Sequence, residues 1–112
     1  MSSDLEVMDD IVVEARVDWI DLGHAIGLVS LAEGGEDDLA LLRRAGTLVV
    51  QLVRDGRLMP GDIGTAPGLF VPWPTPPSES ARLLEEYVHA VISGSRPYEP
   101  WQPCLFAAGE AA

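Results

Sequence analysis

Residues 38–54 read DLALLRRAGTLVVQLVR, and this stretch decides the fold. Its apolar residues recur at helical spacing in two neighbouring stripes, one starting at Leu39 and the other at Leu41. Two stripes together make a wide apolar face, which is expected for a helix at the centre of a small domain. Gly56 follows at a place where helices often end on a glycine. The sequence therefore predicts a central helix over residues 38–54.

Helical patterns also lie on both sides of this stretch. The first helix is predicted over about residues 4–15, where Ser3 and Glu6 match a capping box and Leu5 and Met8 begin the inward face. The second is predicted over about residues 22–31, with Asp21 as its N-cap. A fourth has Thr75 or Ser78 as its N-cap, a proline at 76 or 77 in its first turn, and its end at Gly94.

Short extended patterns separate these helices. Val17, Trp19 and Ile20 form a short apolar break that predicts a three-residue strand, and the Pro-Gly-Asp sequence at residues 60–62 predicts a turn. LFVPW at residues 69–73 predicts a strand that Pro72 confines to a sheet edge, and residues 101–107 predict a last strand, also at an edge. The elements together predict an α+β, winged-helix-like fold with four helices and a small antiparallel sheet, in which the two-strand unit after the central helix is the wing. We expect a single domain over residues 1–112 with an ordered core at about 4–107.

Composition excludes many activities. The chain has 112 residues with 18 acidic and 7 basic side chains, a net charge of −11, and every basic residue is an arginine. The absence of lysine excludes a P-loop and a Schiff-base lysine. A single cysteine excludes an intramolecular disulfide and a zinc site built from several cysteines. We therefore expect a protein that is not an enzyme and that needs no cofactor and no metal.

The sequence also carries no targeting signal that we recognise. It shows no basic start followed by an apolar run, and no stretch of about 18 apolar residues that could span a membrane. A lone cysteine, Cys104, fits a reducing compartment and is expected to be a small buried apolar residue. We expect a cytoplasmic protein with no membrane contact.

Several segments are similar to a known group of proteins. They are DWIDL (18–22), LVRDGRLMPGDI (52–63), FVPWP (70–74) and PPSESARLLEEYVHAV (76–91). Over about residues 5–106 they resemble small uncharacterised bacterial proteins, mostly actinobacterial, with a winged-helix-like layout. The resemblance implies that fold and no particular activity. Residues 64–68 look like an insertion in the wing, a departure from the pattern.

The acidic residues gather in the first part of the chain, because residues 1–42 hold eleven acids and one arginine. This concentration predicts an acidic face for a basic partner protein, formed by Asp9, Asp10, Asp37 and Asp38. Glu14 and Glu36 add to the same field. For any single acid, solubility alone is an adequate explanation. Our leading hypothesis is a small acidic protein-interaction or regulatory module that uses this face or the wing.

A DNA-binding transcriptional regulator is the alternative hypothesis. In a winged helix the central helix would hold the recognition position, and its polar edge carries Arg43, Arg44, Thr47, Gln51 and Arg54. The net charge of −11 opposes phosphate binding, and a solvated polar face explains these residues equally well. Such a regulator would probe the major groove, and a homodimer fits that mode best.

The remaining candidates have weaker signals. The aromatic residues Trp19, Phe70 and Trp73 are expected under the sheet, with Trp101 as the exposed exception. His24 and His89 stand far apart without ligand spacing, so they predict no metal site.

Overall fold

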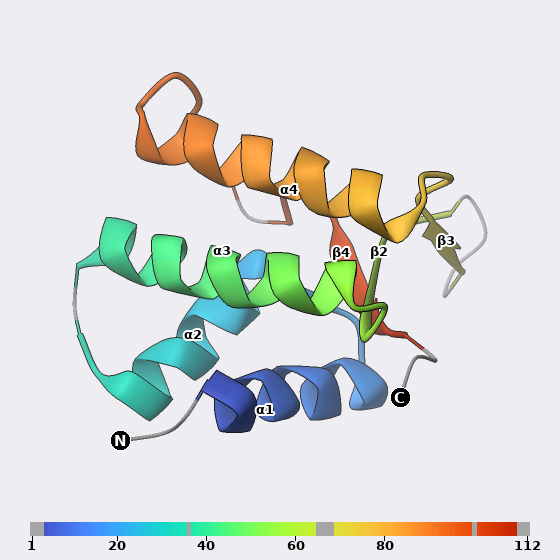
Figure 1. The fold of residues 1–112 in the computed structure, drawn as a ribbon, viewed down its shortest axis with the longest axis horizontal. Coiled ribbons are helices and arrows are strands. Elements are labelled where there is room, and N and C mark those ends of the chain that lie inside the picture. The colour runs from blue at the N-terminus through green and yellow to red at the C-terminus, as the bar shows by residue number, and fades with distance from the viewer. Residues whose placement is uncertain (1–3, 36, 65–68, 100, 110–112) are drawn as a thin grey trace.

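The computed structural model describes residues 4–35, 37–64, 69–99 and 101–109. Over these residues the chain forms four helices and a four-stranded antiparallel sheet, which confirms the predicted α+β class (Figure 1). The order is α1 (Asp4–Val17), β1 (Ile20–Asp21), α2 (Leu22–Glu33), α3 (Asp38–Arg54), β2 (Leu58–Ile63), β3 (Phe70–Pro72), α4 (Pro77–Ile92) and β4 (Leu105–Ala108).

The central helix α3 has the predicted bounds, and local chemistry fixes both of its ends. At its start the Asp37 carboxylate accepts hydrogen bonds from the backbone N–H groups of Leu39 and Ala40. At its end Gly56 adopts a φ of 78°, which glycine tolerates best. The N–H groups of Gly56 and Arg57 donate to carbonyl oxygens of the last turn at 3.0 and 2.9 Å, closing a Schellman motif.

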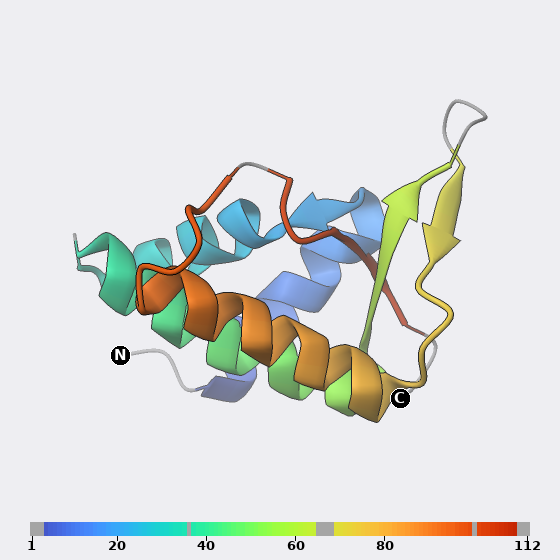
Figure 2. The ribbon, with the colours of Figure 1, turned by 90° about the horizontal axis from the view of Figure 1, so that it is seen from above.

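Helix α3 is buried on two sides, as its two apolar stripes predict. Helices α1 and α2 pack on one side, and α4 runs alongside the other in the opposite direction (Figures 1 and 2). The contact with α4 depends on Gly46, because a Cβ there would lie 3.0 Å from both methyl groups of Val88. Leu39 was predicted to face inward but is half exposed. It lies in the first turn of α3, where the helix extends past the elements packed against it.

The sheet has the strand order β1-β4-β2-β3, with every neighbouring pair antiparallel. The hairpin of β2 and β3 confirms the predicted two-strand unit after α3, and Pro72 lies in an edge strand as expected. The predicted edge position of the last strand is wrong, since β4 lies between β1 and β2. The reason is that β4 begins at Leu105, after Pro103, so it retains the N–H groups that two neighbours need.

Three further predictions need correction. Residues 60–62 were expected to form a turn but belong to β2, because the hairpin turns later in the chain. Val17 belongs to α1 instead of a short strand, which leaves only Ile20–Asp21 as β1. Leu5 is exposed instead of inward, and Val7 and Ile11 fill that face of α1. The predicted capping residue at position 3 lies outside the described residues, and so do residues 65–68 of the insertion predicted at 64–68.

The core lies between the helices and one face of the sheet. Phe106 of β4 is fully buried there, with Ile20 and Pro60 as its cross-strand neighbours. Tyr87 on the inner face of α4 is also buried, which the sequence pattern did not predict. No helix in the described part of the chain is long and apolar enough to cross a membrane.

Two glycine substitutions test this packing. Gly46→Leu is expected to lower the free energy of unfolding by about 1–3 kcal/mol, because the added side chain meets Val88 and forces α3 from α4. Gly27→Ala is the matched control in α2, where a Cβ meets nothing within 4 Å, and it should raise stability by about 0.5–1 kcal/mol. Urea denaturation measures both. A Gly46→Leu variant as stable as the wild type would contradict the close packing of α3 and α4.

Candidate interaction surface

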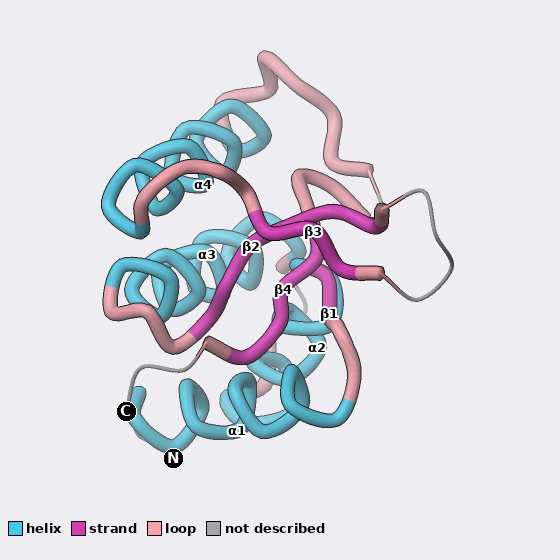
Figure 3. Tube along the Cα trace, turned by 90° about the vertical axis from the view of Figure 1, so that its right-hand side faces the viewer, coloured by secondary structure: helices cyan, strands magenta, loops and turns pink. Residues whose placement is uncertain are grey.

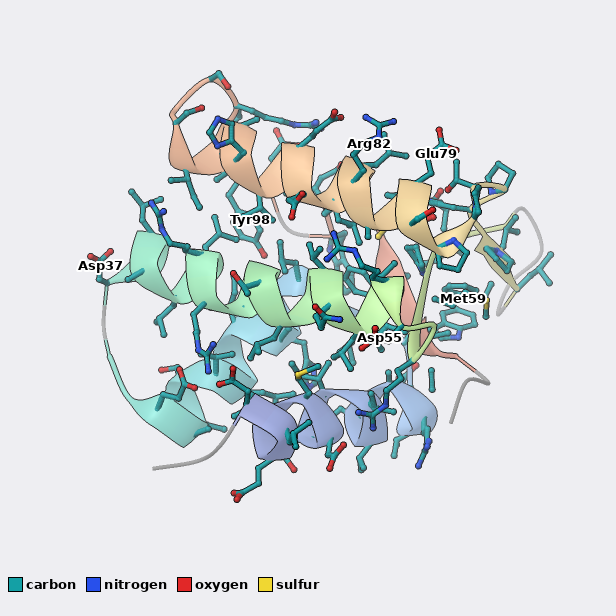
Figure 4. All side chains as sticks on the ribbon, in the orientation of Figure 1. Asp37, Asp55, Met59, Glu79, Arg82 and Tyr98 are labelled. Atoms are coloured by element: carbon teal, nitrogen blue, oxygen red, sulfur yellow. The ribbon has the colours of Figure 1, made fainter. Side chains whose placement is uncertain are left out.

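The four predicted acidic residues do not form one face. Asp9 on α1 accepts a hydrogen bond of 2.8 Å from the Arg57 guanidinium, just past the C-terminal end of α3. Asp37 and Asp38 lie at the opposite end of α3, and Figure 4 shows Asp37 and Asp55 at its two ends. A helix of 17 residues is about 25 Å long, so the two pairs of acids are well separated.

The acids also differ in how they are used. The Asp37 carboxylate already caps α3, and Asp9 is held by Arg57, whereas Asp10 is exposed on α1. Asp38 borders a pocket of about 390 Å³ beside Tyr98 and Leu39. Glu14 lies 3.5 Å from the His24 imidazole, and Glu36 lies outside the described residues. The structure therefore brings the predicted acidic residues to separate places.

The predicted nucleic-acid residues of α3 are largely engaged inside the molecule. Arg44 binds both Glu33 of α2, at 2.9 Å, and Asp4 of α1. The hydrogen bonds to Glu33 and Asp4, of which the one to Glu33 has the larger effect, raise the pKa of Arg44. The hydrogen bond that Arg44 donates lowers the pKa of Asp4 in turn.

The other members of that set have partners on α3 or α4. Arg54 lies 3.9 Å from the Glu85 carboxylate of α4. The Gln51 amide donates to Asp55, and the Thr47 hydroxyl donates to the Arg43 carbonyl oxygen. Arg43 itself is exposed. The basic stretch of the sequence is thus largely neutralised by acids that lie near it in the fold.

The position of α4 further limits what α3 can reach. Figures 1 and 2 show the two helices side by side over most of their length. Packed helices have axes about 8–10 Å apart, so the pair is roughly 20 Å wide. The major groove is about 12 Å wide and admits a single helix. With α4 in this position, α3 does not present the protruding edge that groove reading needs.

DNA binding can therefore be tested directly on α3. We expect no salt-sensitive binding of a labelled random duplex, measured by fluorescence anisotropy at low salt, because the arginines are paired and α3 is flanked. Arg43→Ala and Arg44→Ala should leave that result unchanged. Salt-sensitive binding that weakens in these variants, and stays intact in Arg96→Ala, would instead establish α3 as a recognition helix.

Histidine and cysteine form no reactive cluster in the part of the chain that the structure describes. No group of three or more His, Cys, Asp or Glu residues there could hold a metal ion. Cys104 is buried as expected, and burial raises the pKa of its thiol to about 12. His89 is exposed near the end of α4. A buried, protonated thiol is a poor nucleophile, so Cys104 has a structural role.

Cys104 labelling follows from this burial. At pH 8 the thiol of the native protein should react with a disulfide reagent such as DTNB only after unfolding, and promptly in urea. The raised pKa of Cys104 also makes the stability of the protein depend on pH. The buried neutral thiol contributes fully to the free energy of unfolding below about pH 9, and this contribution is lost as the pH rises toward 12. Prompt labelling of the folded protein would contradict the buried position.

A groove between β2 and the start of α4 does not resemble a small-molecule site. It measures about 540 Å³, with Leu58, Met59 and Trp73 in its walls. Its two hydroxyl groups, from Thr75 and Ser80, lie 2.6 Å apart and bond to each other. Ligand sites usually combine apolar walls with polar groups free to orient the ligand. Here those polar groups are already satisfied.

The outer face of the sheet is the most unusual surface. The helices cover the other face, and Figure 3 looks onto the strands with α2 and α3 behind them. Antiparallel sheets usually turn polar residues to water on an open face. Here the outward residues of β2, β3 and β4 are apolar, and β1 contributes the acid Asp21, which pairs with Leu105. The apolar residues are Met59, Gly61 and Ile63 of β2, Phe70 and Pro72 of β3, and Leu105 and Ala107 of β4.

An aromatic pair forms the middle of this surface. The rings of Trp19 and Phe70 lie 5.4 Å apart at an angle of 48°. Phe70 covers Gly61, where an added Cβ would lie 2.5 Å from the ring. Both aromatic residues are half-buried, so the expectation that they belong to the core is wrong. The helices already fill the inner face, and the pair therefore packs on the outer one. Trp73 does pack against the core, and Trp101 is 67% exposed as expected.

The hairpin extends this apolar surface beyond the helices (Figures 2 and 3). Ile63, Leu69 and Val71 are 61%, 49% and 45% exposed. Residues 58–77 contain one charged residue, Asp62, in a chain in which 22% of residues are charged. This run with a single charge was a sequence signal for this surface. We call the outward residues of β2, β3 and β4, with Trp19, the sheet face. Leu69 and Val71 project from the opposite face of the hairpin, as Asp62 does, because Val71 pairs with Asp62 and alternates with Phe70.

The chain matches no protein-family model, no curated protein and no solved structure. The predicted resemblance to small bacterial winged-helix-like proteins therefore stays a prediction.

Proposed function

We propose that this protein is a non-enzymatic protein-interaction module that binds its partner through the sheet face. The observation that carries this proposal is an apolar outer sheet surface, with Asp21 of β1 as the acid among its described strand residues, on a molecule with a net charge of −11. Isolated apolar residues are common on protein surfaces, but a continuous apolar patch indicates a contact site. The acidic remainder of the surface keeps the free protein soluble.

The sheet face has the organisation of an interface centre. Half-buried aromatic side chains are typical anchors of binding energy, and Trp19 with Phe70 provides two of them in contact. Ile63 and Pro72 extend the apolar area and are exposed, whereas Asp62 projects from the opposite face of the hairpin. Each Å² of apolar surface removed from water contributes roughly 25 cal/mol. The acids of α1, such as Asp10, lie outside this centre, where charges steer association more than they hold it.

The alternative remains a winged-helix DNA-binding regulator. The element order, the hairpin after α3 and the exposed Arg43, Thr47 and Gln51 support it. The engaged Arg44 and Arg54 and the flanking α4 favour the interaction module instead. We place the winged-helix-like layout in the same proposal, as a scaffold that presents the sheet face.

Site-specific photo-crosslinking tests the proposed function. A photoreactive amino acid at Ile63, in the sheet face, is expected to crosslink a protein partner in living cells. The same amino acid at Val13, on the outward face of α1, is the control, since the two residues are 61% and 53% exposed. The Ile63 product should disappear when the exposed Pro72 of the same face is changed to Asp, because a charge there opposes apolar burial. Identical products from Ile63 and Val13, or none from Ile63, would refute the proposal.

A further inference from the structure

We infer that the pocket of about 390 Å³ between α2, α3 and Tyr98 binds a small organic cation, with an ammonium or guanidinium group attached to an apolar body. This inference goes beyond the proposed function, because none of the residues that line the pocket belongs to the sheet face. Three observations support it: the apolar walls of the pocket, a carboxylate without a partner, and a tyrosine that borders the pocket beside α2.

The walls of this pocket come from three helices. Ile26 belongs to α2, Leu39 and Leu42 belong to the first turns of α3, and Val91 belongs to the end of α4. Leu42 and Val91 are buried, whereas Leu39 is 50% exposed. Ligand pockets typically enclose about 300–1,000 Å³ behind mainly apolar walls, and this pocket has both properties. A ligand in it would cover the Leu39 side chain that the helices leave exposed.

Asp38 supplies the charge of the pocket. It is one of the lining residues, and within the described part of the chain its carboxylate has no hydrogen bond or ion pair. The preceding Asp37 differs, because its carboxylate caps α3. No arginine or histidine is among the described residues that line the pocket. Arg96, on the same segment as Tyr98, lies over the Tyr87 ring at 4.7 Å. The charge of Asp38 is therefore available for a cationic ligand.

Tyr98 borders the pocket beside α2, and Figure 4 shows it between α3 and α4. A Cβ on Gly23 would lie 2.9 Å from the Tyr98 hydroxyl oxygen and 3.4 Å from a carboxylate oxygen of Asp21, so these two groups are close together. Burial raises the pKa of the Tyr98 phenol, and Asp21 and Tyr87 add to this effect. The phenol is therefore neutral at physiological pH. Its ring can hold a cation by a cation–π contact, and its oxygen can accept a hydrogen bond.

The charge distribution favours a cation over other ligands. A molecule with a net charge of −11 repels an anion, and Asp38 adds to this repulsion at the pocket. A neutral apolar ligand would remove water from the Asp38 carboxylate without supplying a donor, which costs free energy. A cation that donates to this carboxylate avoids that cost, while its apolar body covers Leu39. An apolar pocket with one unpaired acid is thus complementary to an amphiphilic cation.

Titration of the purified chain with three small probes tests the inference, followed by proton–nitrogen correlation NMR spectra. The probes are phenethylammonium, neutral phenethyl alcohol and anionic phenylpropionate, which share an aromatic ring on a short chain. We expect phenethylammonium to shift the backbone signals of Gly23 and Leu39, with a dissociation constant between about 10 µM and 1 mM. The neutral and anionic probes should bind about tenfold more weakly or less, because they lack the charge that Asp38 attracts.

Matched variants locate the charge and the ring. Asp38→Asn removes the carboxylate at nearly constant size and should weaken the binding of phenethylammonium by about tenfold or more. Asp10→Asn makes the same change on the exposed surface of α1 and should alter the dissociation constant by less than about threefold. Tyr98→Ala removes the ring and should weaken binding about fivefold. Pro72→Asp lies in the sheet face and should leave binding unchanged, so this test is independent of the proposed function.

Three outcomes would overturn the inference. They are no shift of the Gly23 or Leu39 signals by phenethylammonium up to about 10 mM, equal binding of the three probes, and equal losses of affinity in Asp38→Asn and Asp10→Asn. Asp38 is exposed, so its variant should keep the fold, which circular dichroism checks. The comparison of the three probes uses the unaltered chain and decides the question even where a variant is disturbed. Each of these outcomes leaves the proposed function standing, because the sheet face is not part of the pocket.

Discussion

The close contact between α3 and α4 at Gly46 is the constraint on which the rest of the structure depends. It allows α4 to lie along α3, so that α3 is buried on two sides and supplies the centre of the core. The chain between the two helices must then leave the helical body and return to it, which it does as the hairpin of β2 and β3. The described helices consequently pack against the inner face of the sheet (Figure 3). On the outer face Gly61 and Leu105 are buried, whereas Ile63 and Pro72 stay exposed.

Electrostatics follows from the same arrangement. Helix α1 and the end of α2 bring Asp4, Asp9 and Glu33 beside the arginines of α3 and its C-terminal turn. Such exposed pairs contribute little to stability, but they remove cations from the surface that a nucleic acid would need. The excess of acids then remains on helices away from the sheet. The fold thus separates two kinds of surface, an acidic one on the helices and a mainly apolar one on the strands, where Asp21 and Asp62 are the acids among the described residues.

Local rules predicted the helices well and the sheet poorly. The stripes of α3, the Asp21 cap and the glycines after α3 and α4 each depend on a few neighbouring residues, and each appears as expected. The central place of β4 depends instead on pairing with residues more than 40 positions away, which no local pattern encodes. The prediction of one acidic face was wrong for a related reason. The position of Asp37 directly before the helix is typical of an N-cap. The ion-pair partners of Asp9 and Arg44, in contrast, follow only from the tertiary fold.

The absence of charge was the more informative signal. Acids scattered over a small protein are explained by solubility, so the number of acids says little about where a partner binds. A run of 20 residues with one charge is different, because a solvated hairpin gains nothing from Phe70 or Ile63 at its surface. Such side chains reduce solubility and expose an edge, and Pro72 limits that hazard by removing a backbone donor. The sheet face is apolar, and its edge is blocked against extension of the sheet. This combination suits contact through side chains, and it distinguishes a binding interface from apolar residues that are merely poorly packed.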